Sequence, residues 1–352
     1  MSIDRPVLGL DLGTMTLAAG YAFPGEEPQP LMMHVRSKTA APHYKSELLI
    51  SDEDEVRRPD FKGRVKSRFG NLTAMLGQPP QIIAGAPYGS NSLIDMLVGP
   101  AIDAADRLDA RPDDIAAVVP SHWPSYTVDQ YCAALSTTGL NVIPVEAADS
   151  LASYAELVDT DGLVTCLNIG GQAAASTLAM PQGKGERKWE TYEFTRTGSM
   201  GYIAQQIVVS IANRIAPTYK PSNAWLRQAT EVGKRILRAS QKATSPNSLI
   251  TASMSAPVGK VNVRAGQVND LVEDLMRQAL RTLTDNPDMQ GLWEDDRNAG
   301  IPKTLLVAGG FSTNPAVGRA IRTEIGPYRA VDYPQAIPAM GAARYVAEGR
   351  IS

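Results

Sequence analysis

A carboxylate followed by a glycine turn stands near the start of the chain, in the segment GLDLGTMT. The apolar run before it predicts a strand that ends at Asp11. Gly13 and Thr14 then form a tight turn that presents backbone N–H groups and a hydroxyl. Such a turn can hold phosphate oxygens while the carboxylate faces a hydrated divalent cation. Taken alone, the segment is also consistent with a plain β-hairpin.

Two later segments have related chemistry. In LNIGGQAAAST the strand and turn recur, and Gly170 and Gly171 leave room for a ligand to approach the backbone. Residues 304–321 predict a buried strand that runs into Gly309 and Gly310 and then a helix. The bare backbone there would let a flat ring or a ribose lie close, and the helix N-terminus favours an anion. Ordinary tight turns are the competing interpretation of both segments.

A basic segment, LRQATEVGKRILRAS at residues 226–240, predicts a helix. Its charged residues recur at i, i+3, i+4 and i+7, so they share one face of the helix. These residues are Glu231, Lys234, Arg235 and Arg238. The face could contact a ligand, or it could be a solvated surface supported by ion pairs along the helix.

These segments need a scaffold that brings them together. A strand, a polar turn and a returning strand occur twice, at Asp11 and at Asn168, and helices and further strands follow each copy. The repetition predicts a duplicated α/β architecture with two lobes, each a mixed sheet flanked by helices, and a cleft between them. The first lobe is expected to span residues 1–162, with a small subdomain at about 25–75, and to be completed by the C-terminal helix 333–352. The second lobe is expected to span residues 163–332, with a small subdomain at about 220–300.

The composition narrows the classes of function. The 352 residues are 43% hydrophobic and 20% charged, and the net charge of -3 gives no general attraction to nucleic acid. Cys132 and Cys166 stand alone in apolar runs, which indicates buried thiols and gives no support for a disulfide or metal framework. The N-terminus does not resemble a signal peptide, and no apolar run approaches the roughly 18 residues that span a bilayer. We therefore expect a cytoplasmic protein with no membrane insertion.

Taken in order, the motifs resemble the nucleotide-binding domain of the seventy-kilodalton (DnaK-type) heat-shock chaperones, within the actin and sugar-kinase superfamily. GLDLGTMT and LNIGGQ are similar to the two phosphate motifs, and LRQATEVGKRIL is similar to the helix that contacts adenine and ribose. VAGGFSTNPAV resembles the adenosine motif, and YPQAIPAMGAARY resembles the closing helix. The resemblance covers nearly the whole chain. It implies an actin-like fold that holds ATP or ADP, with Mg²⁺ at the phosphates, and no peptide-binding domain after the closing helix.

The resemblance also assigns roles. Asp11 would face metal-bound waters, Lys66 would lie near the terminal phosphate, and Glu146 would position the attacking water. Lys66 is alternatively an exposed lysine of a basic stretch that could serve as a docking surface. The metal would be held through water by Asp11 and Asn168. The positions expected to contact the nucleotide are Gly13, Thr14, Met15, Gly170, Gly171, Gln172, Glu231, Lys234, Arg235, Arg238, Gly309, Gly310, Phe311 and Thr313.

Departures from the family pattern concentrate where hydrolysis needs chemistry. Met15 stands in place of a threonine, Asn168 in place of the second aspartate, and Gln172 in place of the third glycine of the turn. Asparagine removes a negative charge from the cation's surroundings, and the Gln172 side chain could intrude where phosphate should meet bare backbone. Further replacements are Ala147, Ala173, Thr313 and Gln335. Losing one charge-stabilising group commonly lowers the rate by roughly 10²–10³-fold, so we expect ATP hydrolysis to be slow or lost.

The leading interpretation is a stand-alone, chaperone-like protein in which adenine-nucleotide binding is retained or weakened. It would regulate or scaffold an unidentified protein partner through lobe closure. An active ATPase of the actin-like or chaperone type is the alternative, and in the actin-like case it would form filaments. A small-molecule kinase shares the lobed core, but the chaperone-like helix at 226–240 argues against it. The oligomeric state does not follow from the sequence.

Overall fold

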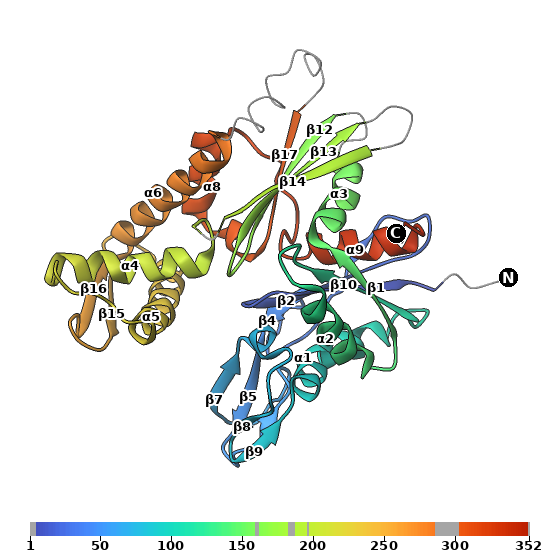
Figure 1. Ribbon diagram of the computed structural model, residues 1–352, viewed down its shortest axis with the longest axis horizontal. Helices are drawn as coiled ribbons and strands as arrows, with labels where there is room; N and C mark the ends of the chain where they lie inside the picture. Colours follow the sequence, from blue (N-terminus) through green and yellow to red (C-terminus); the bar gives the residue numbers. More distant parts are fainter. Residues whose placement is uncertain (1–4, 159–161, 182–186, 196, 286–302, 351–352) are drawn as a thin grey trace.

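The computed structural model describes residues 5–158, 162–181, 187–195, 197–285 and 303–350. The fold is mixed α/β, which confirms the predicted class, and the described residues form two main sheets and three small ones. Figure 1 shows the two main sheets with helices packed around them. Among the described residues, no helix combines the length and apolar character needed to cross a membrane.

The first main sheet has six strands, with β4 paired to β2 beside the path β11-β10-β1-β2-β3. Strands β1 and β2 form an antiparallel hairpin, while β10 runs parallel to β1 and β11 runs parallel to β10. The hairpin closes where the Gly13 N–H donates to the Thr16 carbonyl at 3.0 Å. The strands are β1 (Val7–Leu12), β2 (Thr16–Ala22), β3 (Gln29–Pro30), β4 (His43–Lys45), β10 (Asp114–Val119) and β11 (Asn141–Glu146).

The second main sheet has the order β14-β13-β12-β17. Its strands β12 and β13 form an antiparallel hairpin, and β17 runs parallel to β12. The register pairs Asn168 with Ala308, so the end of β17 lies beside the turn of this hairpin. That turn closes where the Gly170 N–H donates to the Ala173 carbonyl at 2.8 Å. The strands are β12 (Leu163–Ile169), β13 (Ala174–Pro181), β14 (Arg187–Thr195) and β17 (Lys303–Ala308).

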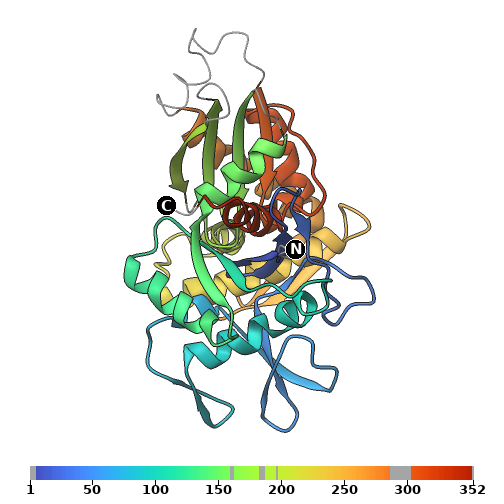
Figure 2. The same cartoon turned by 90° about the vertical axis from the view of Figure 1, so that its right-hand side faces the viewer.

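Two helices, α3 (Ala147–Val158) and α9 (Ile337–Ala347), lie between the main sheets, as Figures 1 and 2 show. One apolar cluster contains residues of both sheets, such as Ala18 and Val164, together with Met340 of α9. The approach is close because a Cβ added to Gly341 would overlap the Ser150 carbonyl oxygen of α3. Burial of this shared apolar surface joins the two sheets.

Further helices complete both sides of the molecule. Helices α1 (Ser90–Ala105) and α2 (Ser125–Ser136) cover the first sheet and enclose a core that includes Leu8 and Ile115. A second core joins the second sheet to four helices and a small hairpin. The helices are α4 (Met200–Ile215), α5 (Asn223–Lys242), α6 (Ala265–Thr284) and α8 (Pro315–Glu324), and the hairpin consists of β15 (Leu249–Ser253) and β16 (Lys260–Arg264). Helix α5 begins after a serine cap, because the Ser222 side chain accepts a hydrogen bond from the Trp225 N–H.

The remaining elements lie beside the first sheet and are small. A three-stranded sheet has the order β6-β5-β7, and β8 pairs with β9 in a two-stranded sheet. Their bounds are β5 (Glu47–Ser51), β6 (Val56–Arg57), β7 (Val65–Gly70), β8 (Gln81–Ile83) and β9 (Ala86–Tyr88). Two short 3₁₀ turns, η1 (Leu72–Met75) and η3 (Gly310–Thr313), follow β7 and β17.

Candidate functional site

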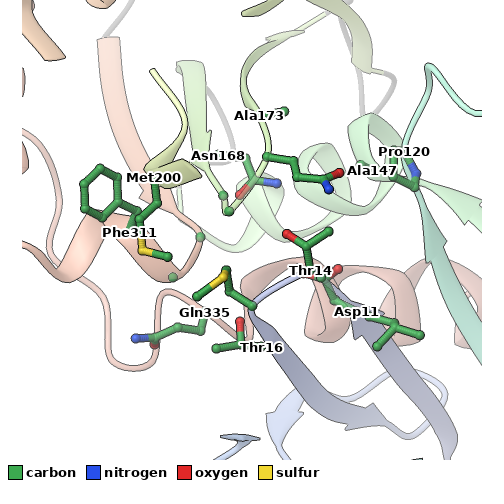
Figure 3. Close-up of a pocket in the computed structure, with 18 of the residues that line it drawn as sticks. Asp11, Thr14, Thr16, Pro120, Ala147, Asn168, Ala173, Met200, Phe311 and Gln335 are labelled. Atoms are coloured by element: carbon green, nitrogen blue, oxygen red, sulfur yellow. The ribbon is translucent and has the colours of Figure 1, made fainter. Parts of the chain in front are cut away.

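The two hairpin turns and the end of β17 meet at one cavity of about 330 Å³. Figure 3 shows Asp11 and Thr14 on one side of it, Asn168 and Ala173 on the other, and Phe311 and Met200 toward one end. Parallel strands end at a common edge of each sheet, and loops at that edge are the usual place for a ligand in α/β folds. The residues predicted from the sequence that line the cavity are Asp11, Gly13, Thr14, Met15, Asn168, Gly170, Gly171, Gln172, Arg238, Gly309, Gly310, Phe311 and Thr313.

The two hairpin turns touch each other through Met15. A Cβ added to Gly171 would lie 2.6 Å from both the Met15 Cγ and the Thr14 Oγ1. Gly171 therefore makes room for the first turn, and the methionine side chain occupies the space between the turns. In this arrangement a phosphate group could pass between the two turns only if Met15 moved.

Gly309 brings the end of β17 against the second hairpin turn. Its φ of +90° is a conformation that side chains rarely adopt, and an added Cβ would overlap the Ile169 carbonyl oxygen and lie 2.6 Å from the Asn168 Oδ1. The Gly309 N–H donates to the Pro334 carbonyl at 2.9 Å, which ties this corner to the segment before α9. Glycine is thus required at this position, and the corner that it forms with Gly310 lines the cavity.

Asp11 is the acidic residue among the described residues that line the cavity. It retains partial exposure toward the cavity, and burial of its surroundings raises the pKa of its carboxyl to about 7. Burial raises the pKa of the Tyr131 hydroxyl in α2, and the negative charge of Asp11 adds to that rise. A carboxylate held in this way gains stability from any cation that enters the cavity.

The cavity offers few oxygen ligands for Mg²⁺. In the described ranges, no three His, Cys, Asp or Glu side chains form a group that could hold a metal ion. Asp11 and Asn168 offer one carboxylate and one amide oxygen. Mg²⁺ usually keeps several waters and takes one or two carboxylates with substrate phosphates, so these residues fit a water-mediated ion that arrives with a nucleotide.

The structure places two predicted catalytic residues away from the cavity. The Lys66 Nζ lies 2.6 Å from the Asp54 Oδ1 in an exposed ion pair on β7, and Lys66 does not line the cavity. Lys45, in β4, supplies a cation at the lining instead. Glu146 is the exposed last residue of β11 and lies outside the lining, although its neighbour Ala147 contributes to it.

Of the four residues predicted on the basic helix, Arg238 is the one that lines the cavity. Glu231 and Lys234 pair with each other at 2.7 Å, and neither they nor Arg235 line the cavity. Arg238 and Gln241, nearer the C-terminal end of α5, do line it. The turn of α5 that meets the cavity depends on how the helix packs against α4, which the spacing of the charged residues does not specify.

The loop that follows β10 also lines the cavity, and no sequence motif predicts it. Ser121, His122 and Trp123 line the cavity, and the Trp123 ring contacts the Tyr131 ring edge-on with centroids 5.5 Å apart. The signal that points to this loop is topological, because β10 runs parallel to β1 and therefore ends at the same edge as Asp11.

Comparison with known proteins adds no assignment. No protein-family model matches the chain, and no curated protein matches it. Within the described part of the chain, the cavity combines two glycine turns, a glycine at positive φ, one acidic side chain and cations from β4 and α5.

Proposed function

We propose that the protein binds an adenine nucleotide in the cavity between the two main sheets, as a chaperone-like member of the actin-type fold with two duplicated lobes. The observation that carries the proposal is that two glycine turns, the Gly309–Gly310 corner and Arg238 line one cavity. Exposed backbone N–H groups in turns bind phosphate oxygens, and the glycine corner lets a flat ring lie close to the chain. The similar strand pattern of the two sheets supports the duplication.

Hydrolysis is proposed to be slow or lost. Met15 fills the space between the turns, Asn168 lacks the negative charge of an aspartate, and Lys66 lies in an ion pair elsewhere. Phosphoryl transfer depends almost wholly on positioning and on neutralising charge, and these substitutions weaken both. We propose that the bound nucleotide instead stabilises one arrangement of the two sheets, which a protein partner reads.

An active ATPase is the second candidate, and Asp11 favours it. A carboxyl with a pKa of about 7 at the cavity wall can accept a proton from an attacking water at neutral pH. The two candidates differ in turnover. Phosphate release that is abolished by Asp11→Asn would support the ATPase, and release at the background rate would support the binding protein.

Calorimetric titration with ADP and with ATP, each with and without Mg²⁺, tests the proposed function. We expect one site per chain, with ADP bound more tightly than ATP because Met15 closes the gap between the turns. Arg238→Gln should weaken binding, whereas Arg227→Gln, at an exposed position about three turns earlier on α5, serves as the matched control. Absence of heat with every nucleotide would refute the proposal.

A further inference from the structure

A second hollow lies beside the first cavity and has a volume of about 660 Å³. Strands β2, β4, β5 and β7 form its walls, together with the loop of residues 33–41. Thr16 and Lys45 line both hollows, so the two are neighbours. Sites for small molecules commonly have volumes of about 300–1,000 Å³, and this hollow falls within that range.

The charges around this hollow are unbalanced. Arg36, Lys45 and Arg68 line it, and Glu47 is the acidic residue that faces them from the described part of the chain. Glu47 forms ion pairs with two of these cations, because one of its carboxylate oxygens lies 2.6 Å from the Arg68 guanidinium and 3.5 Å from the Lys45 ammonium. The Arg36 guanidinium donates to the Phe61 carbonyl, which is neutral. Two positive charges thus remain uncompensated among the described residues.

The loop that carries Arg36 is held in a defined shape. Met33 and Ala41 exchange two backbone hydrogen bonds of 2.9 and 3.0 Å, which close the loop at its base. Within the loop, Arg36 adopts a φ of +53°, and the Thr39 N–H donates to the Ser37 hydroxyl at 3.1 Å. A non-glycine residue at positive φ is unfavourable and persists only where its surroundings impose it. The loop therefore presents its arginine and hydroxyls to the hollow in a fixed arrangement.

We propose that this hollow is a second ligand site, which takes a small molecule carrying two negative charges, either as a phosphate or as carboxylates. Two guanidinium groups match such a ligand, because each can form charge-assisted, forked hydrogen bonds to phosphate or carboxylate oxygens. The hydroxyls of Ser37 and Thr39 add neutral partners. The concave shape suits a small molecule better than the flat surface of a protein partner. The site is separate from the proposed nucleotide site, apart from the shared Thr16 and Lys45.

Thermal unfolding of the full chain, titrated with inorganic pyrophosphate and separately with citrate, tests the proposal. KCl at the same ionic strength provides the reference for non-specific salt effects. We expect a saturable rise in the unfolding temperature with at least one of the two anions. The anion that gives the tighter saturation identifies the ligand as phosphate-bearing or carboxylate-bearing.

Three variants locate the effect. Arg36→Gln and Arg68→Gln should each weaken the apparent affinity by about tenfold or more, which is the usual loss for a charge-assisted hydrogen bond. Arg64→Gln removes the same charge at an exposed position four residues before Arg68, outside the hollow, and should change the affinity less than twofold. The Arg36 guanidinium also supports the loop, so Arg36→Gln could fail to fold. In that case Arg68→Gln alone tests whether the hollow binds the anion.

Three outcomes would overturn the proposal. The first is no saturable effect with either anion. The second is an equal loss in Arg64→Gln, which would indicate attraction by overall charge. The third is a loss confined to Arg238→Gln, which would place the anion in the first cavity. The first two outcomes do not bear on whether that cavity binds a nucleotide, because the calorimetric titration tests that separately.

Discussion

Replacing Asp11 by asparagine should stabilise the free protein at neutral and alkaline pH. The carboxyl has a pKa of about 7 in the folded chain and an ordinary value of 3.8. Between these values the folded state keeps a proton that the unfolded state has released, so wild-type stability falls as the pH rises and levels off above about 7. Asparagine has a similar shape and does not titrate, so the variant lacks this loss.

The size of the effect follows from the same values. The pKa difference of about 3 units corresponds to about 4 kcal/mol above pH 7, at about 1.4 kcal/mol per unit. This figure is an upper bound, because Asp11 keeps some exposure to water in the cavity. Between pH 5 and pH 8, wild-type stability falls only up to the folded pKa of about 7, which is an interval of about 2 pH units. The stability gap between the two proteins should therefore widen by about 2–3 kcal/mol over that interval.

Urea unfolding of both proteins at pH 5, 6, 7 and 8 measures the gap. Tryptophan fluorescence is a suitable signal because Trp123 packs against Tyr131 close to the site. Asp52→Asn, at an exposed position after β5, controls for the loss of one charge. A gap that stays constant with pH, or that narrows as pH rises, would show that burial does not raise the pKa of Asp11, and the electrostatic account of the cavity would be wrong.

Three further predictions concern the same cavity. Gly309→Ala should destabilise the protein by about 3–4 kcal/mol in urea unfolding. Gly85→Ala is the control, because Gly85 has a similar positive φ but nothing lies within 4 Å of its added Cβ, and it should cost only about 1–2 kcal/mol. Equal losses would show that close packing at Gly309 is unimportant. Lys45→Gln should weaken ADP binding in calorimetry more than Lys66→Gln does, because Lys45 lines the cavity and Lys66 does not. A larger loss of ADP affinity in Lys66→Gln would restore the role that the sequence motif predicts for Lys66. Met15→Gly should raise the affinity for ATP relative to ADP by about tenfold, because a steric conflict of about 1–3 kcal/mol is removed. An unchanged ratio of the two affinities would show that the methionine does not obstruct the terminal phosphate.

Local sequence patterns determined most of the elements. The apolar runs that end at Asp11 and Asn168 are strands, and each is followed by a closed glycine turn. Ser222 begins α5, and Asn314 with Pro315 begins α8, as their types predict. These features were predictable because hydrogen bonds and backbone preferences within a few residues decide them.

Only the tertiary structure decided which side chains meet at the cavity. Strand alternation places Lys66 and Arg68 on one face of β7, but it does not say what that face looks toward. Helical spacing likewise defines the face of α5 that carries Lys234 and Arg238, and the packing of α5 on α4 determines that only the second lines the cavity. Lys45 reaches the lining because β4 pairs with β2, although residues 23–42, which include β3, separate the two strands in the sequence. Contacts between residues distant in sequence depend on the packing of whole elements, which spacing along the chain does not encode.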